Sequence, residues 1–137
     1  MRILALLALV TLAGCMAETP VALTLDATTY TITTTGVPTA AVAPGSTFQV
    51  IVKVAGSVES MTDHAGAHFG KNSTATPSTS VYTSTCTHSG GKLPQTFTAT
   101  CKAPQTAGVY HLRGHARVTK DNVTTNWWGA DETFTVG

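Results

Sequence analysis

Apolar and polar residues alternate with a period of two along most of the chain. The strongest example is the segment 48–54, where Phe or Val fills every second position from Phe48 to Val54. This pattern is typical of a strand with one buried face. Further strands are predicted at 80–85, 95–101, 109–119, 123–128 and 132–136, with weaker alternation at 21–25 and 30–32. No window shows a helical stripe with capping residues, so the chain is predicted to be all-β.

Composition agrees with this prediction. Beyond the first dozen residues the chain is rich in Thr, Val and Ala and poor in Glu, Lys, Leu and Gln, which favours sheet over helix. A length of 137 residues accommodates one domain. Charged residues make up only 11% and the formal net charge is +1, which argues against a charge-driven nucleic-acid-binding or polybasic membrane module.

The chain begins with an export signal. Arg2 precedes an apolar run, 3–10, that is shorter than the roughly 20 residues a membrane span needs. The run leads into Leu12-Ala13-Gly14-Cys15, which resembles the lipobox of bacterial lipoproteins. The resemblance implies that residues 1–14 are removed, that Cys15 is acylated, and that 15–20 form a short membrane tether. The alternative is an ordinary signal peptide followed by an unrelated Cys.

The same resemblance bears on localisation. Residue 16 is Met and not Asp, and in Gram-negative lipoproteins an Asp at that place resembles an inner-membrane retention signal. We therefore expect an exported, lipid-anchored protein at the outer membrane, on its periplasmic face or at the cell surface, if the host is Gram-negative. Acylation of Cys15 leaves Cys86 and Cys101 as a pair. A disulfide is predicted because the exported compartment is oxidising, whereas two free thiols binding a metal are less compatible with it.

The arrangement of strands and turns narrows the fold of residues 21–137. Short strands separated by Gly, Pro, Ser and Asn turns predict a β-sandwich or a barrel. The segment Ala107-Gly108-Val109-Tyr110 resembles the approach to the penultimate strand of immunoglobulin-like domains, where a Tyr packs at a corner. The resemblance implies an immunoglobulin-like antiparallel β-sandwich. Cys86 and Cys101 are too close in sequence for the usual inter-sheet bridge of antibody domains, so we expect them to join a neighbouring strand pair or loop.

The last predicted hairpin is the most informative segment. Alternation over 109–119 turns Tyr110, Leu112, Ala116 and Val118 toward the core and leaves an outer row formed by His111, Arg113, His115 and Arg117. A two-residue turn at Asp121-Asn122 would pair His115 with Trp128 and Ala116 with Trp127. The register places Trp127 in the core and Trp128 on the polar face, with Asp131 and Glu132 near the His111 end.

This outer face has the composition of a binding surface. Trp and Arg dominate interaction hot spots, and Trp also stacks on sugar rings. The leading hypothesis is therefore a binding or surface-interaction module that recognises an envelope or extracellular protein or glycan through Trp128, His115, Arg113, Arg117 and His111. Replacement of Arg113 and Trp128 by Ala would then weaken capture of the partner without lowering the melting temperature. The alternative interpretation is that Trp128 shelters under a loop and that the row is a solvated sheet face with cross-strand ion pairs. The row is too short to form a nucleic-acid groove.

Histidine gives a second hypothesis, a periplasmic zinc- or copper-binding lipoprotein. His111 and His115, four residues apart on a strand, would lie about 13 Å apart and could not share an ion. A site would instead use His64 and His68, brought together by a loop or helical turn, with His115, His111 or His88 and with Asp63. Met61 could serve copper(I), although a single Met in a β-domain is more often in the core. The alternative is that all the histidines are solvated or hydrogen-bonded.

Catalytic patterns are missing from the sequence. It contains no Gly-x-Ser-x-Gly elbow, no phosphate-binding Gly loop and no HExxH. We therefore expect no enzymatic activity and, outside the metal hypothesis, no cofactor. A passive envelope component without a small ligand is the third interpretation.

Overall fold

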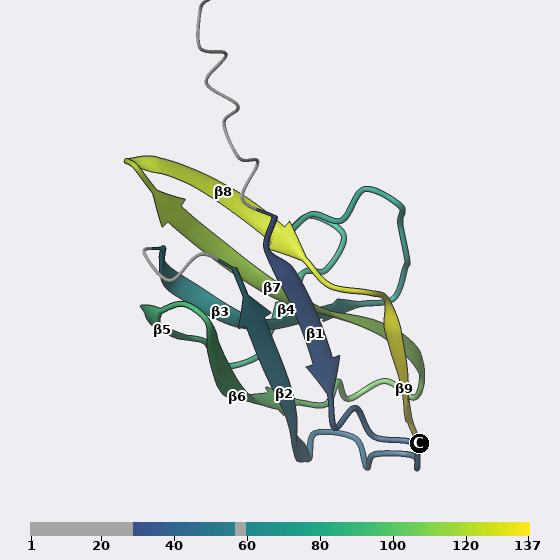
Figure 1. The fold of residues 1–137 in the computed structure, drawn as a ribbon. Helices are drawn as coiled ribbons and strands as arrows, with labels where there is room; N and C mark the ends of the chain where they lie inside the picture. Colours follow the sequence, from purple (N-terminus) through teal and green to yellow (C-terminus); the bar gives the residue numbers. More distant parts are fainter. Residues whose placement is uncertain (1–28, 57–59) are drawn as a thin grey trace, which may run out of the picture.

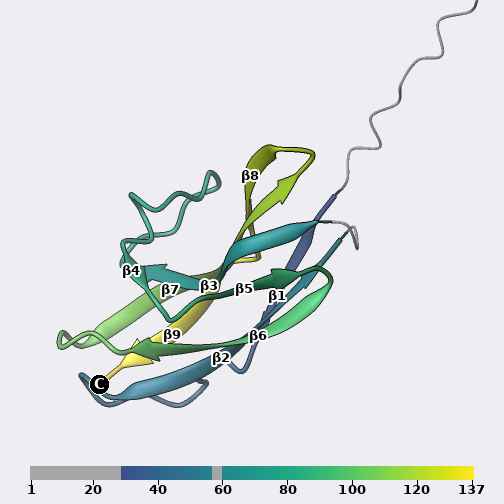
Figure 2. The ribbon, with the colours of Figure 1, turned by 90° about the vertical axis from the view of Figure 1, so that its left-hand side faces the viewer.

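The computed structural model describes residues 29–56 and 60–137. The predicted signal peptide, Cys15, the tether and the predicted strand at 21–25 all lie outside the described residues. The described chain forms a β-sandwich of two antiparallel sheets, one of three strands and one of six (Figure 1, Figure 2). It includes no helix with the length and apolar character that a membrane crossing requires.

The smaller sheet has the order β1-β2-β6. Its strands are β1 (Thr31–Thr35), β2 (Thr47–Ala55) and β6 (Gln95–Lys102). The alternation predicted for 48–54 is confirmed, because Val50, Val52 and Val54 are fully buried while Gln49, Ile51 and Lys53 are exposed. From β6, Phe97 and Ala99 turn toward the same core.

The larger sheet is built around two long central strands, β3 (Met61–Gly70) and β7 (Gly108–Lys120). The outer edge of β3 pairs with β4 (Ser84–Thr85) and β5 (Ser89–Lys92). The other edge of β7 pairs with β8 (Val123–Trp128) and then with β9 (Glu132–Val136). The strands predicted at 95–101, 109–119, 123–128 and 132–136 are thus confirmed.

The β7–β8 hairpin forms as predicted. Asp121 and Asn122 have positive φ angles of 50° and 63°, as a two-residue hairpin turn of the primed type requires. The turn sets the predicted register, in which His115 pairs with Trp128 and Ala116 with Trp127. Trp127 packs against the core, where its ring meets that of Tyr30 at a centroid distance of 5.2 Å.

The two sheets approach closely at one glycine. A Cβ atom on Gly114 of β7 would lie 2.5 Å from Thr34 Oγ1 and 2.8 Å from Ile32 Cγ2, so only glycine lets β1 cross here. At the start of the same strand, the Tyr110 hydroxyl donates a hydrogen bond of 2.8 Å to the Thr106 carbonyl oxygen.

Three expectations need correction. The strand predicted at 80–85 is reduced to β4, and residues 71–83 instead form a long connection that lies on the side of the larger sheet facing away from the smaller one (Figure 2). The segment that carries His64 and His68, expected as a loop or helical turn, belongs to β3. The Cys86–Cys101 disulfide is present, and Cys86 lies in the loop between β4 and β5, which is one of the two expected arrangements. It joins a segment hydrogen-bonded to β3 of the larger sheet with β6 of the smaller sheet. The inference that the short sequence separation excludes a bridge between the sheets is therefore wrong.

Candidate functional site

The outer face of β3 presents histidines and glycines in turn. His64, Gly66, His68 and Gly70 share this face, while Ala65, Ala67 and Phe69 pack in the core. The small side chains on both faces explain the missing hydrophobic alternation. Glycine is required on the outer face because other segments pass over it: a Cβ on Gly70 would lie 2.4 Å from the Val81 carbonyl oxygen.

The pairing of β3 with β7 gathers three histidines. Gly66 lies opposite His115, so the imidazole of His115 is flanked by His64 and His68, two residues to either side of Gly66. The Nε2 atoms of His64 and His68 lie 3.1 Å apart. One ligand nitrogen from each of the three residues lies within 4.8 Å of the other two. We call His64, His68 and His115 the histidine triad.

His64, His68 and His115 lie together, as the metal hypothesis requires, but they meet in an unexpected way. His64 and His68 converge from one strand, because their side chains lean toward each other over the side-chain-free Gly66. The argument that histidines four residues apart on a strand cannot share an ion is therefore wrong. His111 is absent from the group. Its Nδ1 lies 2.7 Å from a carboxylate oxygen of Asp131 instead.

Three other candidate ligands, Asp63, Met61 and His88, are not members of the triad. Asp63 sits at a bulge in β3 and accepts hydrogen bonds from Arg117 Nε, at 2.9 Å, and from Arg117 Nη2. It is not part of the group of close ligand atoms. Met61, expected in the core, is 46% exposed. His88 is exposed, and its ring stacks on that of His64 at a centroid distance of 4.2 Å.

Burial keeps the triad neutral near pH 7. The pKa of His68 falls to about 4, first because burial disfavours the imidazolium and then because His115 and His64 lie close by. Burial also lowers the pKa of His115 to about 4, against a hydrogen bond from its ring to Asn126 that favours the charged form. The pKa of His64 is lowered by burial and by His88. Neutral imidazoles carry the lone pairs that metal ions bind.

His115 has an unsatisfied ring nitrogen. The residue is only 4% exposed, and its Nδ1 is buried without a hydrogen-bond partner. Its Nε2 lies 3.0 Å from Asn126 Oδ1. If Nε2–H donates to that oxygen, the lone pair is on Nδ1. A metal-binding histidine usually donates its other ring N–H to an outer oxygen acceptor, which fixes the tautomer, and Asn126 Oδ1 is an acceptor in that position. A buried polar atom without a partner is costly unless something binds it.

Trp128 covers one side of the triad. Its ring lies 4.2 Å from the ring of His115 and 5.4 Å from that of His68, centroid to centroid. A pocket of about 310 Å³ opens beside it. Its lining combines the connection 71–83 with β7 and β8: Pro77, Ser78, Thr79, His115, Arg117, Asn126 and Trp128.

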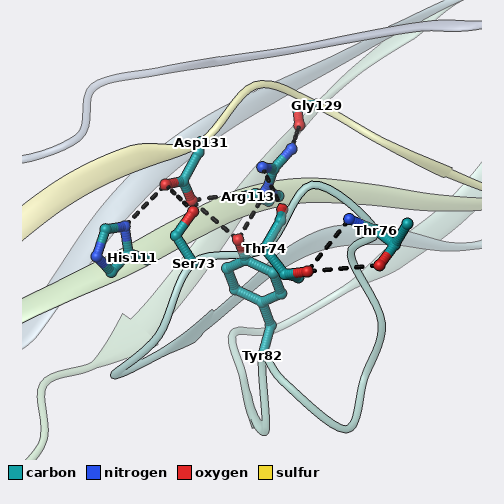
Figure 3. A network of polar contacts seen from close by, with 8 residues as sticks. All are labelled: Ser73, Thr74, Thr76, Tyr82, His111, Arg113, Gly129 and Asp131. Atoms are coloured by element: carbon teal, nitrogen blue, oxygen red, sulfur yellow. Dashed lines mark hydrogen bonds and ion pairs between the residues drawn. The ribbon is translucent and has the colours of Figure 1, made fainter.

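A network centred on Asp131 fastens the connection 71–83 to the sheet (Figure 3). The Asp131 carboxylate accepts hydrogen bonds from Ser73 Oγ, at 2.7 Å, and from the Tyr82 hydroxyl, at 3.0 Å, in addition to its contact with His111. Burial acts to raise the pKa of Asp131, but the hydrogen bonds from Ser73, His111 and Tyr82 outweigh it and leave the pKa lowered.

Arg113 completes this network. Its Nε donates to the Tyr82 hydroxyl at 2.8 Å, and its two terminal nitrogens donate to the carbonyl oxygens of Gly129, at 2.9 Å, and Thr74, at 3.0 Å (Figure 3). Its side chain is only 15% exposed. Arg113 is therefore bound to internal partners and does not face solvent as the binding-surface hypothesis expected.

The predicted exposed face is thus largely covered. The alternation of β7 is confirmed, but His115 is buried and Trp128 is half-buried. Arg117 stays exposed and is paired with Asp63. Alternation along β7 could not show that residues 71–83 lie over this face, although shelter of Trp128 under a loop is the alternative interpretation of the sequence.

The donor set fits a zinc or copper(II) ion. Zinc binds imidazole nitrogen at about 2.0–2.1 Å in a tetrahedron, which puts neighbouring ligand atoms about 3.3 Å apart. The 3.1 Å between the Nε2 atoms of His64 and His68 is close to that edge. Copper(II) also binds neutral imidazole. No protein-family model matches the chain, and no curated protein shows significant similarity to it.

Proposed function

We propose that this protein binds a zinc or copper(II) ion through His64, His68 and His115. The observation that carries the proposal is the convergence of three ligand nitrogens within 4.8 Å, two of them on residues that are only 4% exposed, His68 and His115. The unpartnered Nδ1 of His115 supports it further, because a metal ion would satisfy the only buried ring nitrogen that lacks a partner among the described residues.

Electrostatics also supports the proposal. Three neutral imidazoles can accept a divalent ion without losing protons first, whereas three charged ones would repel it. The positive charge of Arg117, which disfavours protonation of His64 and His115, is paired with the carboxylate of Asp63. This pairing reduces the repulsion that Arg117 would exert on a metal ion.

Recognition of a protein or glycan is the second candidate function. The pocket of about 310 Å³ beside Trp128 favours it, because an indole and a guanidinium line the same hollow. It ranks second because Arg113 and His115 are bound or buried internally. Of the proposed surface, Arg117 is exposed, and Trp128 and His111 are half-buried.

We also propose that the domain is exported, lipid-anchored at Cys15, and immunoglobulin-like. The Cys86–Cys101 disulfide supports an oxidising compartment. The hydrogen bond from the Tyr110 hydroxyl to the Thr106 carbonyl supports the fold, because a tyrosine corner of this kind marks immunoglobulin-like sandwiches. An outer-membrane site in a Gram-negative host rests on the residue after Cys15.

Calorimetric titration of the purified, detergent-solubilised protein with Zn²⁺ and Cu²⁺ tests the metal proposal. We expect binding of one ion per chain, which a His64→Ala and His68→Ala double variant abolishes. His111→Asn is the matched control, because it removes a histidine of the same face while its amide can still donate to Asp131. Equal binding by the double variant and the parent protein would refute the triad.

A further inference from the structure

His88 lies directly over the centre of the triad. A Cβ atom on Gly66 would be 3.1 Å from His88 Cβ and 3.2 Å from His88 Cα. Gly66 pairs with His115 and stands midway between His64 and His68 along β3. The backbone of His88 therefore holds its side chain above the one position that all three triad residues surround.

The backbone near His88 is firmly anchored. Two residues earlier, Cys86 is joined to Cys101 of β6. Next to it, the Thr87 amide donates to the Thr100 carbonyl oxygen at 2.8 Å, and the Thr100 amide donates to Thr87 Oγ1 at 2.7 Å. The position of the His88 Cα atom is thus fixed by covalent and hydrogen bonds that do not involve its imidazole.

The imidazole of His88, in contrast, is free to turn. It is exposed, and its one ring contact is the stack on His64, with planes inclined by 22°. It makes no hydrogen bond within 29–56 and 60–137. A parallel stack places two rings side by side and does not direct their nitrogens to one point, so a rotation of the His88 side chain is needed before it can share an ion with the triad.

We infer that His88 is the fourth ligand of the proposed metal site and closes it from the solvent side. The inference rests on the proposed function. The four imidazoles differ in exposure: His115 and His68 are buried, His64 is half-buried and His88 is exposed. An ion arriving from solvent would therefore meet His88 first and pass inward to the buried nitrogens. Four protein ligands leave no open position for an activated water, which assigns the site to metal binding and not to hydrolysis.

Pulsed electron paramagnetic resonance of the Cu²⁺-loaded protein counts the coordinated imidazoles. We expect four in the parent protein and three in His88→Ala. Zinc titration should show at least about a ten-fold loss of affinity in His88→Ala, since losing even an outer-layer partner costs about 10- to 100-fold. His88→Gln repeats the test with a side chain of similar length, and thermal unfolding of both apo variants checks that they fold.

The outcomes separate the two proposals. An unchanged imidazole count and affinity in His88→Ala and His88→Gln, with binding still abolished by the His64→Ala and His68→Ala double variant, would overturn the role of His88 alone. Failure of the parent protein to bind either ion would overturn the proposed function and this inference with it.

Discussion

Gly66 of β3 lies opposite His115 of β7, and the missing side chain at Gly66 creates the space in which the histidines meet. The same space admits a second segment from outside, because a Cβ on Gly66 would be 2.8 Å from the Thr87 carbonyl oxygen. One glycine therefore sets both the convergence of the triad and the position of the segment that covers it.

Replacement of Gly66 by Ala should damage the fold and the site together. The new methyl group would push back Thr87 and His88, and overpacking of this kind costs about 1–3 kcal/mol of unfolding free energy. We expect a matching shift in the denaturant midpoint and weaker zinc binding. Gly137→Ala is the control, because nothing lies within 4 Å of a Cβ at that position. Parent-like stability and affinity in Gly66→Ala would contradict the close approach.

The stability of the apo protein should fall as the pH is lowered from 6.5 toward 4. The pKa of His68 and of His115 is about 4 in the folded protein, against an ordinary value of 6.5. In that window the unfolded chain binds protons and the folded chain does not, so the unfolding free energy decreases with falling pH, by a few kcal/mol in order of magnitude. Above 6.5 these two groups should contribute no pH dependence.

Chemical denaturation across this window, with a chelator present, measures the effect. A His115→Asn variant removes one of the two buried imidazoles and should flatten the profile, whatever its stability at neutral pH. Identical unfolding free energies at both ends of the window in the parent protein would show that the imidazoles accept protons in the folded state.

Replacement of Arg113 by Lys should destabilise the protein, contrary to what a solvent-facing Arg would do. A single ammonium group cannot reach the three acceptors that the guanidinium reaches, the Tyr82 hydroxyl and the carbonyls of Gly129 and Thr74. Each hydrogen bond to a charged group contributes about 1.5–3 kcal/mol of unfolding free energy, and this sets the upper limit of the loss per bond. We expect a lower melting temperature and faster proteolysis within 71–83.

Arg117→Lys is the matched control for this experiment. Arg117 lies on the same strand face, but its side chain is 50% exposed and its partner Asp63 is exposed as well. Exposed ion pairs contribute about 0–1 kcal/mol. Equal melting temperatures for Arg113→Lys and Arg117→Lys would show that the network around Asp131 does not hold the connection 71–83.

The hairpin could be predicted because its turn residues and its alternation act locally. Asp121-Asn122 favours one turn type, and that turn fixes which residue of β8 faces His115. The strand β3 could not be predicted in the same way. Its outer face alternates His with Gly, and its inner face carries Ala65 and Ala67, so neither face shows the large apolar residues by which a strand is identified.

The position of residues 71–83 over the outer face of β7 also could not be predicted from a local sequence pattern. Residues 71–83 are held by side chains far away in sequence, above all by Arg113 and Asp131, and such contacts leave no periodic signal. The same reason explains why Arg113 and His115 are not exposed as the binding-surface hypothesis expected. Alternation correctly gave the face on which Arg113 lies, but it could not show what packs on that face.

Tryptophan fluorescence should report metal binding through Trp128 and much less through Trp127. The Trp128 ring lies 4.2 Å from that of His115, whereas Trp127 turns to the opposite face and packs on Tyr30 at 5.2 Å. Copper(II) quenches an excited indole by short-range electron or energy transfer, so the nearer ring should lose most of its emission. Trp128→Phe should therefore remove most of the quenching seen on Cu²⁺ addition, and Trp127→Phe should retain it. The reverse pattern would place the bound ion outside the triad.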